Sequence, residues 1–338
     1  MDKKEYFRNT VLPRLMDIVP FSLIKRLGSR KLIILYYHLV SDEDVPHVRY
    51  LYKFKDTSQF ISDLEFLLKH YSPTGLMDLI RCEKGDNNLP RNPFHLTFDD
   101  GFREIYDVIA PILLEKGIPA TFFISSAFLD NVELCYEHKA SLLIERFNDG
   151  LSAGSAEEVR GILGRIGIHS PRPSEGILKV DYRRREALDR IAAAMQIDFQ
   201  RYLNEKQPYL TTGQIKELID RGFTIGSHSI DHPYYSDLPL AEQLEQTVGS
   251  VRRIRQIFGL NYGAFAFPHN DTGVPPAFFK KTQESGLIDI TFGTGGFIEG
   301  GLQMHRQRIS LEKPVMHARN LIAWQYARRL YRQLTEPK

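Results

Sequence analysis

Two adjacent carboxylates and a pair of histidines are the residues whose types and spacing suggest chemistry. Asp99 and Asp100 close the run FHLTFDD and are followed at once by Gly101. Burying two like charges side by side is costly unless a compensating charge lies near them. His228 and His232 lie four residues apart in GSHSIDH, and on one helical turn this spacing places both imidazoles on the same side. Two histidines and one carboxylate can hold a divalent metal ion with positions left for water.

A metal ion would explain why the two aspartates stand together. One aspartate would be a ligand, and the charge of the ion would let the other stay ionised and act as a base toward water. Taken singly, an Asp-Gly pair is also an ordinary turn, and two histidines can merely cap a helix. Because both motifs follow strand-like runs, we favour the metal site.

The elements that must position these residues alternate between strand and helix patterns. Repeated units of this length predict parallel strands joined by crossover helices. The expected fold is therefore α/β, a distorted (β/α) barrel of the TIM type, with the chemistry at the carboxyl ends of its strands. The strand patterns cover 31–38, 94–100, 120–126, 223–229, 264–270 and 289–296, and the helix patterns cover 58–71, 103–117, 210–222, 239–259 and 276–286.

Three further segments complete the expected organisation. Residues 1–30 are expected to form an N-terminal helical segment, residues 31–315 the barrel, and residues 316–338 a C-terminal helix. Residues 131–207 interrupt the barrel as helices joined by Gly-, Pro- and Ser-rich turns. At the catalytic face this insertion would cap or shape the substrate site, with a structural or oligomer-forming role as the alternative. The basic ends fit helices packed on the domain or, alternatively, helices on an anionic membrane surface.

Composition sets broad limits on the function. The chain has 338 residues, 42% of them hydrophobic and 25% charged, with a net charge of +2, which fits a soluble globular protein and suggests no nucleic-acid partner. Its two cysteines, Cys82 and Cys135, form neither a disulfide framework nor a metal-type cluster. The first 30 residues lack the pattern of a signal peptide. We therefore expect a cytoplasmic protein, with peripheral contact at the inner face of the membrane as an option.

Three motifs together resemble a known family. TFDDG at 97–101, HSIDH at 228–232 and FAFPHNDTG at 265–273 resemble the polysaccharide deacetylases of the NodB-homology type, carbohydrate esterase family 4. ILYYHLV at 34–40 is similar to the first strand of the branch that includes poly-N-acetylglucosamine deacetylases. The resemblance covers about 32–130 and 208–312. It implies a carbohydrate N-deacetylase, a hydrolase of carbon–nitrogen bonds other than peptide bonds, which uses a divalent metal ion, commonly Zn²⁺, with Co²⁺, Ni²⁺ or Mn²⁺ as alternatives.

The resemblance also implies roles for individual residues. Asp99 would be the general base, Asp100, His228 and His232 the metal ligands, and the backbone N–H of His269 an oxyanion donor. Asp271 and His38 are candidate substrate contacts, although His38 fits a supporting position equally well.

Two positions depart from the family pattern. The arginine that many members carry before the proline of the third motif is absent, so Arg306 and Arg308 are the candidates to orient Asp99. The late Leu-x-His motif is matched only by LQMHRQRIS, with altered spacing, which makes His305 the candidate general acid. A surface or packing histidine is the alternative for His305.

Two classes of function stay open at this point. The first is a metal-dependent deacetylase acting on the N-acetyl group of an amino sugar, in a polysaccharide or in a lipid- or nucleotide-linked intermediate of its synthesis. A different metal-dependent amide hydrolase on the same barrel, for example a deformylase of a lipid-linked amino sugar, is its nearest rival. The second class is a catalytically silent sugar-binding module. Retention of Asp99, Asp100, His228 and His232 together favours turnover.

Overall fold

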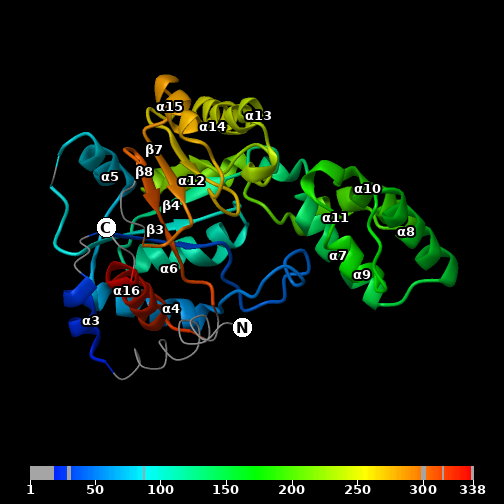
Figure 1. Ribbon diagram of the computed structural model, residues 1–338, viewed down its shortest axis with the longest axis horizontal. Coiled ribbons are helices and arrows are strands. Elements are labelled where there is room, and N and C mark those ends of the chain that lie inside the picture. The colour runs from blue at the N-terminus through cyan, green and yellow to red at the C-terminus, as the bar shows by residue number, and fades with distance from the viewer. Residues whose placement is uncertain (1–18, 29–31, 87, 298–301, 314–315, 336–338) are drawn as a thin grey trace.

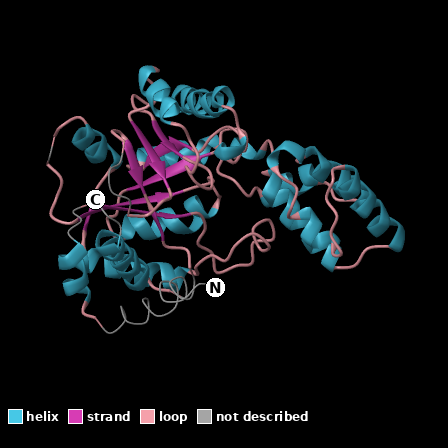
Figure 2. Cartoon of the chain, in the orientation of Figure 1, coloured by secondary structure: helices cyan, strands magenta, loops and turns pink. Residues whose placement is uncertain are grey.

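The chain folds into a barrel of parallel strands with a separate helical lobe on one side (Figures 1 and 2). In this computed structural model the described residues are 19–28, 32–86, 88–297, 302–313 and 316–335. Most of the predicted N-terminal segment, residues 1–18, lies outside them.

The strands pair in the order β8-β7-β6-β5-β4-β3-β1-β9, with β2 beside β3, and every pair is parallel. The two ends of this path are consecutive in the chain, because only Arg308 separates β8 from β9. The sheet therefore curls into a nearly closed barrel, which confirms the predicted fold class. The strands are β1 Ile33–Tyr37, β2 Ser72–Pro73, β3 Pro93–Phe98, β4 Ala120–Ile124, β5 Thr224–Ser227, β6 Ala264–Ala266, β7 Ile290–Gly293, β8 His305–Gln307 and β9 Ile309–Ser310.

Helices surround the barrel and bury the outer faces of its strands. Apolar side chains of β1, β3 and β4 pack with those of α4, α6, α12 and α16 in one core, whereas α5 packs with the interior-facing residues Ile34, Phe123 and Phe292. The barrel helices are α3 Phe21–Gly28, α4 Thr57–His70, α5 Leu76–Glu83, α6 Ala110–Glu115, α12 Thr212–Asp220, α13 Leu240–Leu244, α14 Ser250–Phe258, α15 Pro276–Glu284 and α16 Ala318–Thr335; π-helical turns at Ile105–Ile109 and Glu245–Gly249 precede α6 and α14.

The insertion forms the helical lobe at the right of Figure 1. It has its own apolar core, to which Leu143, Val159, Leu163, Leu188 and Ile191 contribute. The same core takes in Val45 and Val48 from the long loop after β1, so the lobe is packed against the rim of the barrel. Its helices are α7 Tyr136–Asn148, α8 Ala153–Arg165, α9 Pro173–Ile177, α10 Glu186–Met195 and α11 Phe199–Lys206.

The two helices at the chain's ends, α3 and α16, lie against each other on the barrel (Figure 1). Phe21 and Ile24 of α3 are buried in the same core as Leu321, Ile322 and Tyr326 of α16. The apolar sides of both helices therefore face the domain, which fits the expectation of packed helices. Among the described residues, no helix has the length and apolar character needed to cross a membrane.

Candidate active site

The catalytic candidates meet where β3, β5 and β6 end. Asp99 and Asp100 follow β3 directly, and His228 follows β5. The backbone is bent sharply here, since Asp100, His232 and His269 all have positive φ, at 69°, 64° and 54°. Non-glycine residues adopt this conformation at a cost and cluster at functional sites, where the surrounding structure holds them.

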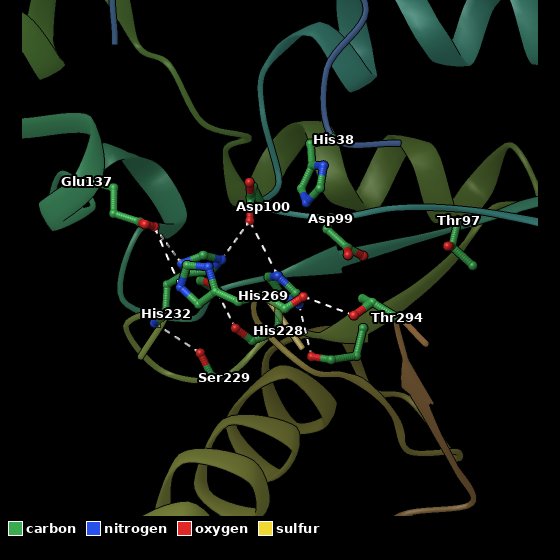
Figure 3. A network of polar contacts seen from close by, with 12 residues as sticks. His38, Thr97, Asp99, Asp100, Glu137, His228, Ser229, His232, His269 and Thr294 are labelled. Atoms are coloured by element: carbon green, nitrogen blue, oxygen red, sulfur yellow. Dashed lines mark hydrogen bonds and ion pairs between the residues drawn. The ribbon is translucent and has the colours of Figure 1, made fainter. Parts of the chain in front are cut away.

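The three predicted metal ligands come together within a small space (Figure 3). Nε2 of His228 lies 3.4 Å and Nε2 of His232 lies 3.2 Å from Oδ1 of Asp100. All three residues are buried. The sequence spacing therefore brought together the expected residues, although His232 does not lie on a regular helix.

The hydrogen bonding of His228 makes this group a good match for a cation. Its Nδ1 donates to the carbonyl oxygen of Ala266 at 2.9 Å, so the neutral ring has a bare lone pair at Nε2. That lone pair faces Oδ1 of Asp100, and neither atom has a hydrogen-bond partner among the described residues. Two buried acceptors that face each other are destabilising unless positive charge lies between them. The donor set of two imidazoles and a carboxylate suits a borderline divalent ion.

Asp99 is held by a different partner. Arg308 lies between β8 and β9 with no exposed surface, and its guanidinium grips the carboxylate through Nη1–Oδ1 and Nη2–Oδ2 contacts of 2.6 and 2.8 Å. Burial alone would raise the pKa of Asp99, but Arg308 and neighbouring histidines outweigh it, so the net pKa is lowered. Of the two arginines expected to orient Asp99, the structure places Arg308 there, whereas Arg306 pairs with Glu83.

His38 directly follows β1 and lies at the same rim (Figure 3). Its Nδ1 contacts Oε2 of Glu312 at 2.5 Å, and its backbone N–H donates to the other oxygen of that carboxylate. Burial alone would lower the pKa of His38, but Glu312 outweighs it and raises the pKa to about 9. His38 is therefore protonated near neutral pH. The sequence offered no signal for Glu312, which lies far from His38 along the chain.

The geometry does not bring His305 and Asp271 to these carboxylates. Nε2 of His305 lies 3.0 Å from Oδ2 of Asp271, and its Nδ1 contacts Thr291. The ring packs on Phe267 and Phe279, on the outer side of the barrel. His305 lies three residues before Arg308 in an extended segment, so the two side chains point to opposite faces. The expected general-acid role of His305 and substrate contact of Asp271 thus find no support in this arrangement.

A cavity of about 360 Å³ opens onto the site. Asp100, His38, His232 and His269 line its inner end. Glu137, in the first turn of α7, also lines it, so the insertion forms one wall. The remaining lining residues are Tyr50, Leu51, Tyr52, Phe128, Cys135, His138, Leu178 and Tyr234.

Comparison with known proteins decides the family. The family model described as polysaccharide deacetylase matches residues 86–159 and 186–283, half of the chain. The chain belongs to the polysaccharide deacetylase family. This deacetylase is thereby a hydrolase of carbon–nitrogen bonds other than peptide bonds. No curated protein matches its sequence.

Solved structures with low sequence identity share the fold of this deacetylase. The Streptococcus pyogenes deacetylase PplD in complex with acetate aligns with a TM-score of 0.57 at 15% identity, over 88% of this chain and 98% of that one. IcaB from Ammonifex degensii aligns with a TM-score of 0.54 at 16% identity, over 88% of this chain and 97% of that one. A de-N-acetylase from Aggregatibacter actinomycetemcomitans gives 0.51 at 16% identity, over 85% and 95% of the two chains.

Proposed function

We propose that this deacetylase removes the N-acetyl group of an amino sugar with the help of a divalent ion, most readily Zn²⁺, held by Asp100, His228 and His232. The observation that carries the proposal is the close approach of Oδ1 of Asp100 and Nε2 of His228, two buried atoms that have no hydrogen-bond partner among the described residues. When bound, the ion would polarise the acetyl carbonyl and offset negative charge that develops on its oxygen.

The residues of this chain would carry the proton transfers. Asp99, fixed by Arg308, takes a proton from the water that attacks the acetyl carbon. The backbone N–H of His269 would lie against the oxygen that becomes negative. As the carbon–nitrogen bond breaks, the sugar nitrogen takes a proton from His38, which leaves acetate and a free amine. We assign this donation to His38 because it lines the cavity and carries a proton near neutral pH, whereas His305 does not line the cavity.

The cavity supports a sugar as the substrate. Its volume of about 360 Å³ accommodates a hexosamine unit, and aromatic side chains such as Tyr52 and Tyr234 line it beside the polar groups. The S. pyogenes deacetylase was solved with acetate, the second product expected of this reaction.

Metal analysis combined with an acetate-release assay tests the proposal. We expect the wild type to contain about one divalent ion per chain and His228→Ala to contain none. His169→Ala changes an exposed histidine of the insertion and is the matched control, with metal content and activity unchanged. Asp99→Asn should retain the metal and lose about 100-fold or more of the acetate release from N-acetylglucosamine oligomers.

Two results would contradict the proposal. If the wild type binds no ion even after Zn²⁺ is added back, the metal-dependent mechanism fails and a sugar-binding module becomes the leading account. If N-formyl sugars are hydrolysed and N-acetyl sugars are not, the chain is a deformylase on the same barrel.

We also propose that the enzyme works in the cytoplasm, on a substrate linked to a lipid or a nucleotide. The basic residues near the chain's ends, including the exposed Arg26 at the end of α3, would allow peripheral contact with an anionic membrane. Co-sedimentation with vesicles that contain anionic lipid tests this contact. Absence of binding at low salt would remove the support for a lipid-linked substrate.

A further inference from the structure

A carboxylate from the insertion lies against one of the metal-ligand candidates. Oε2 of Glu137 lies 3.2 Å from Nδ1 of His232 and 3.7 Å from Nε2 of His269 (Figure 3). Both nitrogen atoms are buried, and neither has a hydrogen-bond partner among the described residues. The side chain of Glu137 itself is 26% exposed, toward the cavity that holds the site.

The ring of His232 thus lies between two carboxylates, since its Nε2 faces Asp100 and its Nδ1 faces Glu137. A neutral imidazole carries one proton, and the nitrogen that binds an ion must be the one without it. An acceptor next to the other nitrogen decides which tautomer forms. For His228 this acceptor is the carbonyl of Ala266.

We propose that Glu137 is the positioning residue for His232: its carboxylate accepts a hydrogen bond from Nδ1–H, which keeps the proton on Nδ1 and leaves Nε2 free to bind the ion. The inference rests on the metal site proposed above. A consequence is that the insertion does more than cover the cavity, because its first helix, α7, supplies the group that prepares one ligand of the barrel.

A second ion site beside His232 is the alternative, and it would require Nδ1 of His232 to carry no proton. The ligand atoms of Cys135, Glu137 and His232 all lie within 4.8 Å of one another, so this group could hold an ion of its own. An ion there would need a bare lone pair at Nδ1, whereas positioning by Glu137 needs a proton on that atom. The number of ions bound therefore separates the two arrangements.

The test uses two variants of nearly equal size, Glu137→Gln and Glu137→Leu. The glutamine carbonyl can still accept a hydrogen bond from Nδ1–H of His232, and leucine cannot. We expect Glu137→Leu to weaken Zn²⁺ binding about 10- to 100-fold, measured by competition with a chromophoric chelator, and Glu137→Gln to stay close to the wild type. Glu133→Leu, at an exposed position of the same segment, is the matched control and should bind Zn²⁺ as the wild type does.

If Glu137 only stabilised the fold, Glu137→Leu would lower the melting temperature of the metal-free protein. We expect the metal-free variant and the metal-free wild type to have the same melting temperature. Equal Zn²⁺ affinity in Glu137→Leu and the wild type, with one ion in each, would overturn the inference and leave the proposed function intact. Two ions in the wild type and one in Glu137→Leu would overturn it in favour of a second ion site. A wild type that binds no ion would contradict the proposed function itself and the inference with it.

Discussion

Replacing Arg308 by methionine would leave the carboxylate of Asp99 buried with no guanidinium beside it. The two side chains are 0% and 2% exposed and are joined by two contacts of 2.6 and 2.8 Å. Removing one partner of such a pair typically costs about 3–5 kcal/mol, because the remaining charge stays buried without compensation. A domain has only about 5–15 kcal/mol of stability in total, so the loss should be large.

A double-mutant cycle separates this pairwise contribution from the rest. Arg308→Met, Asp99→Asn and the double variant are unfolded in urea at pH 7, followed by circular dichroism and by fluorescence of the single tryptophan, Trp324. The double variant buries neither charge, so it should be more stable than the sum of the single losses predicts, with a coupling free energy of about 2–3 kcal/mol. Arg172→Met removes a partner of an exposed surface pair and should cost less than about 1 kcal/mol.

The pH dependence of this stability loss gives a second test, because the direction of the change with pH follows from the pKa of Asp99. Folding lowers the pKa of Asp99, so the pair stabilises the protein above the pKa of the unfolded state, and this contribution is lost as the pH falls through the lower folded value. Without Arg308, burial raises the pKa of Asp99, so the variant takes up a proton at higher pH than the wild type does. The stability difference between the wild type and Arg308→Met should therefore shrink as the pH falls. A coupling free energy under about 0.5 kcal/mol would refute this reasoning. So would a stability difference between the wild type and Arg308→Met that grows as the pH falls.

Three further predictions concern single positions. Because Glu312 raises the pKa of His38 to about 9, kcat/KM for acetate release should fall as the pH rises through about 9. In Glu312→Gln this fall should occur at a pH lower by about one unit or more. An unchanged pH profile in the variant would contradict proton donation by His38. Burial raises the pKa of Glu104 to about 7, above its value in the unfolded chain, so the ionised side chain destabilises the protein fully above about pH 7 and not at all below about pH 4.5. In urea unfolding, Glu104→Gln should therefore stabilise the protein by about 1–3 kcal/mol at pH 8 and leave its stability unchanged at pH 4.5. Equal effects at both pH values would disprove this. A Cβ atom at Gly263 would lie 1.8 Å from the carbonyl oxygen of Leu287, so Gly263→Ala should lower the unfolding free energy by about 2 kcal/mol or more, whereas a wild-type melting temperature would show that the backbone there can move freely.

The parts of the site that the sequence predicted are those encoded locally. Asp99 and Asp100 were identifiable because a buried strand, a turn and two carboxylates follow one another within a few residues. The same holds for His228 and His232. The alternation of strand and helix patterns likewise predicted the barrel, since each unit is a continuous stretch of chain.

The parts that the sequence did not predict depend on contacts between distant residues. Glu312 meets His38 across 274 positions, and no pattern near either residue indicates the other. Glu137 lies in a helix without a recognisable motif and reaches His232 only because the lobe packs on the rim. His305 is a different case, because its motif-like surroundings say nothing about which face of the three-residue strand β8 it occupies.

The position of Arg308 between β8 and β9 also has a consequence for biosynthesis. During translation, the strand that carries Asp99 leaves the ribosome about 200 residues before the arginine that neutralises it, so the nascent barrel holds this carboxylate without its counter-ion. Pairing of the first and last strands is a contact of very high sequence separation and is expected late in folding. Barrel closure and formation of the competent catalytic base would then be one and the same event, which would keep incomplete chains from hydrolysing substrate.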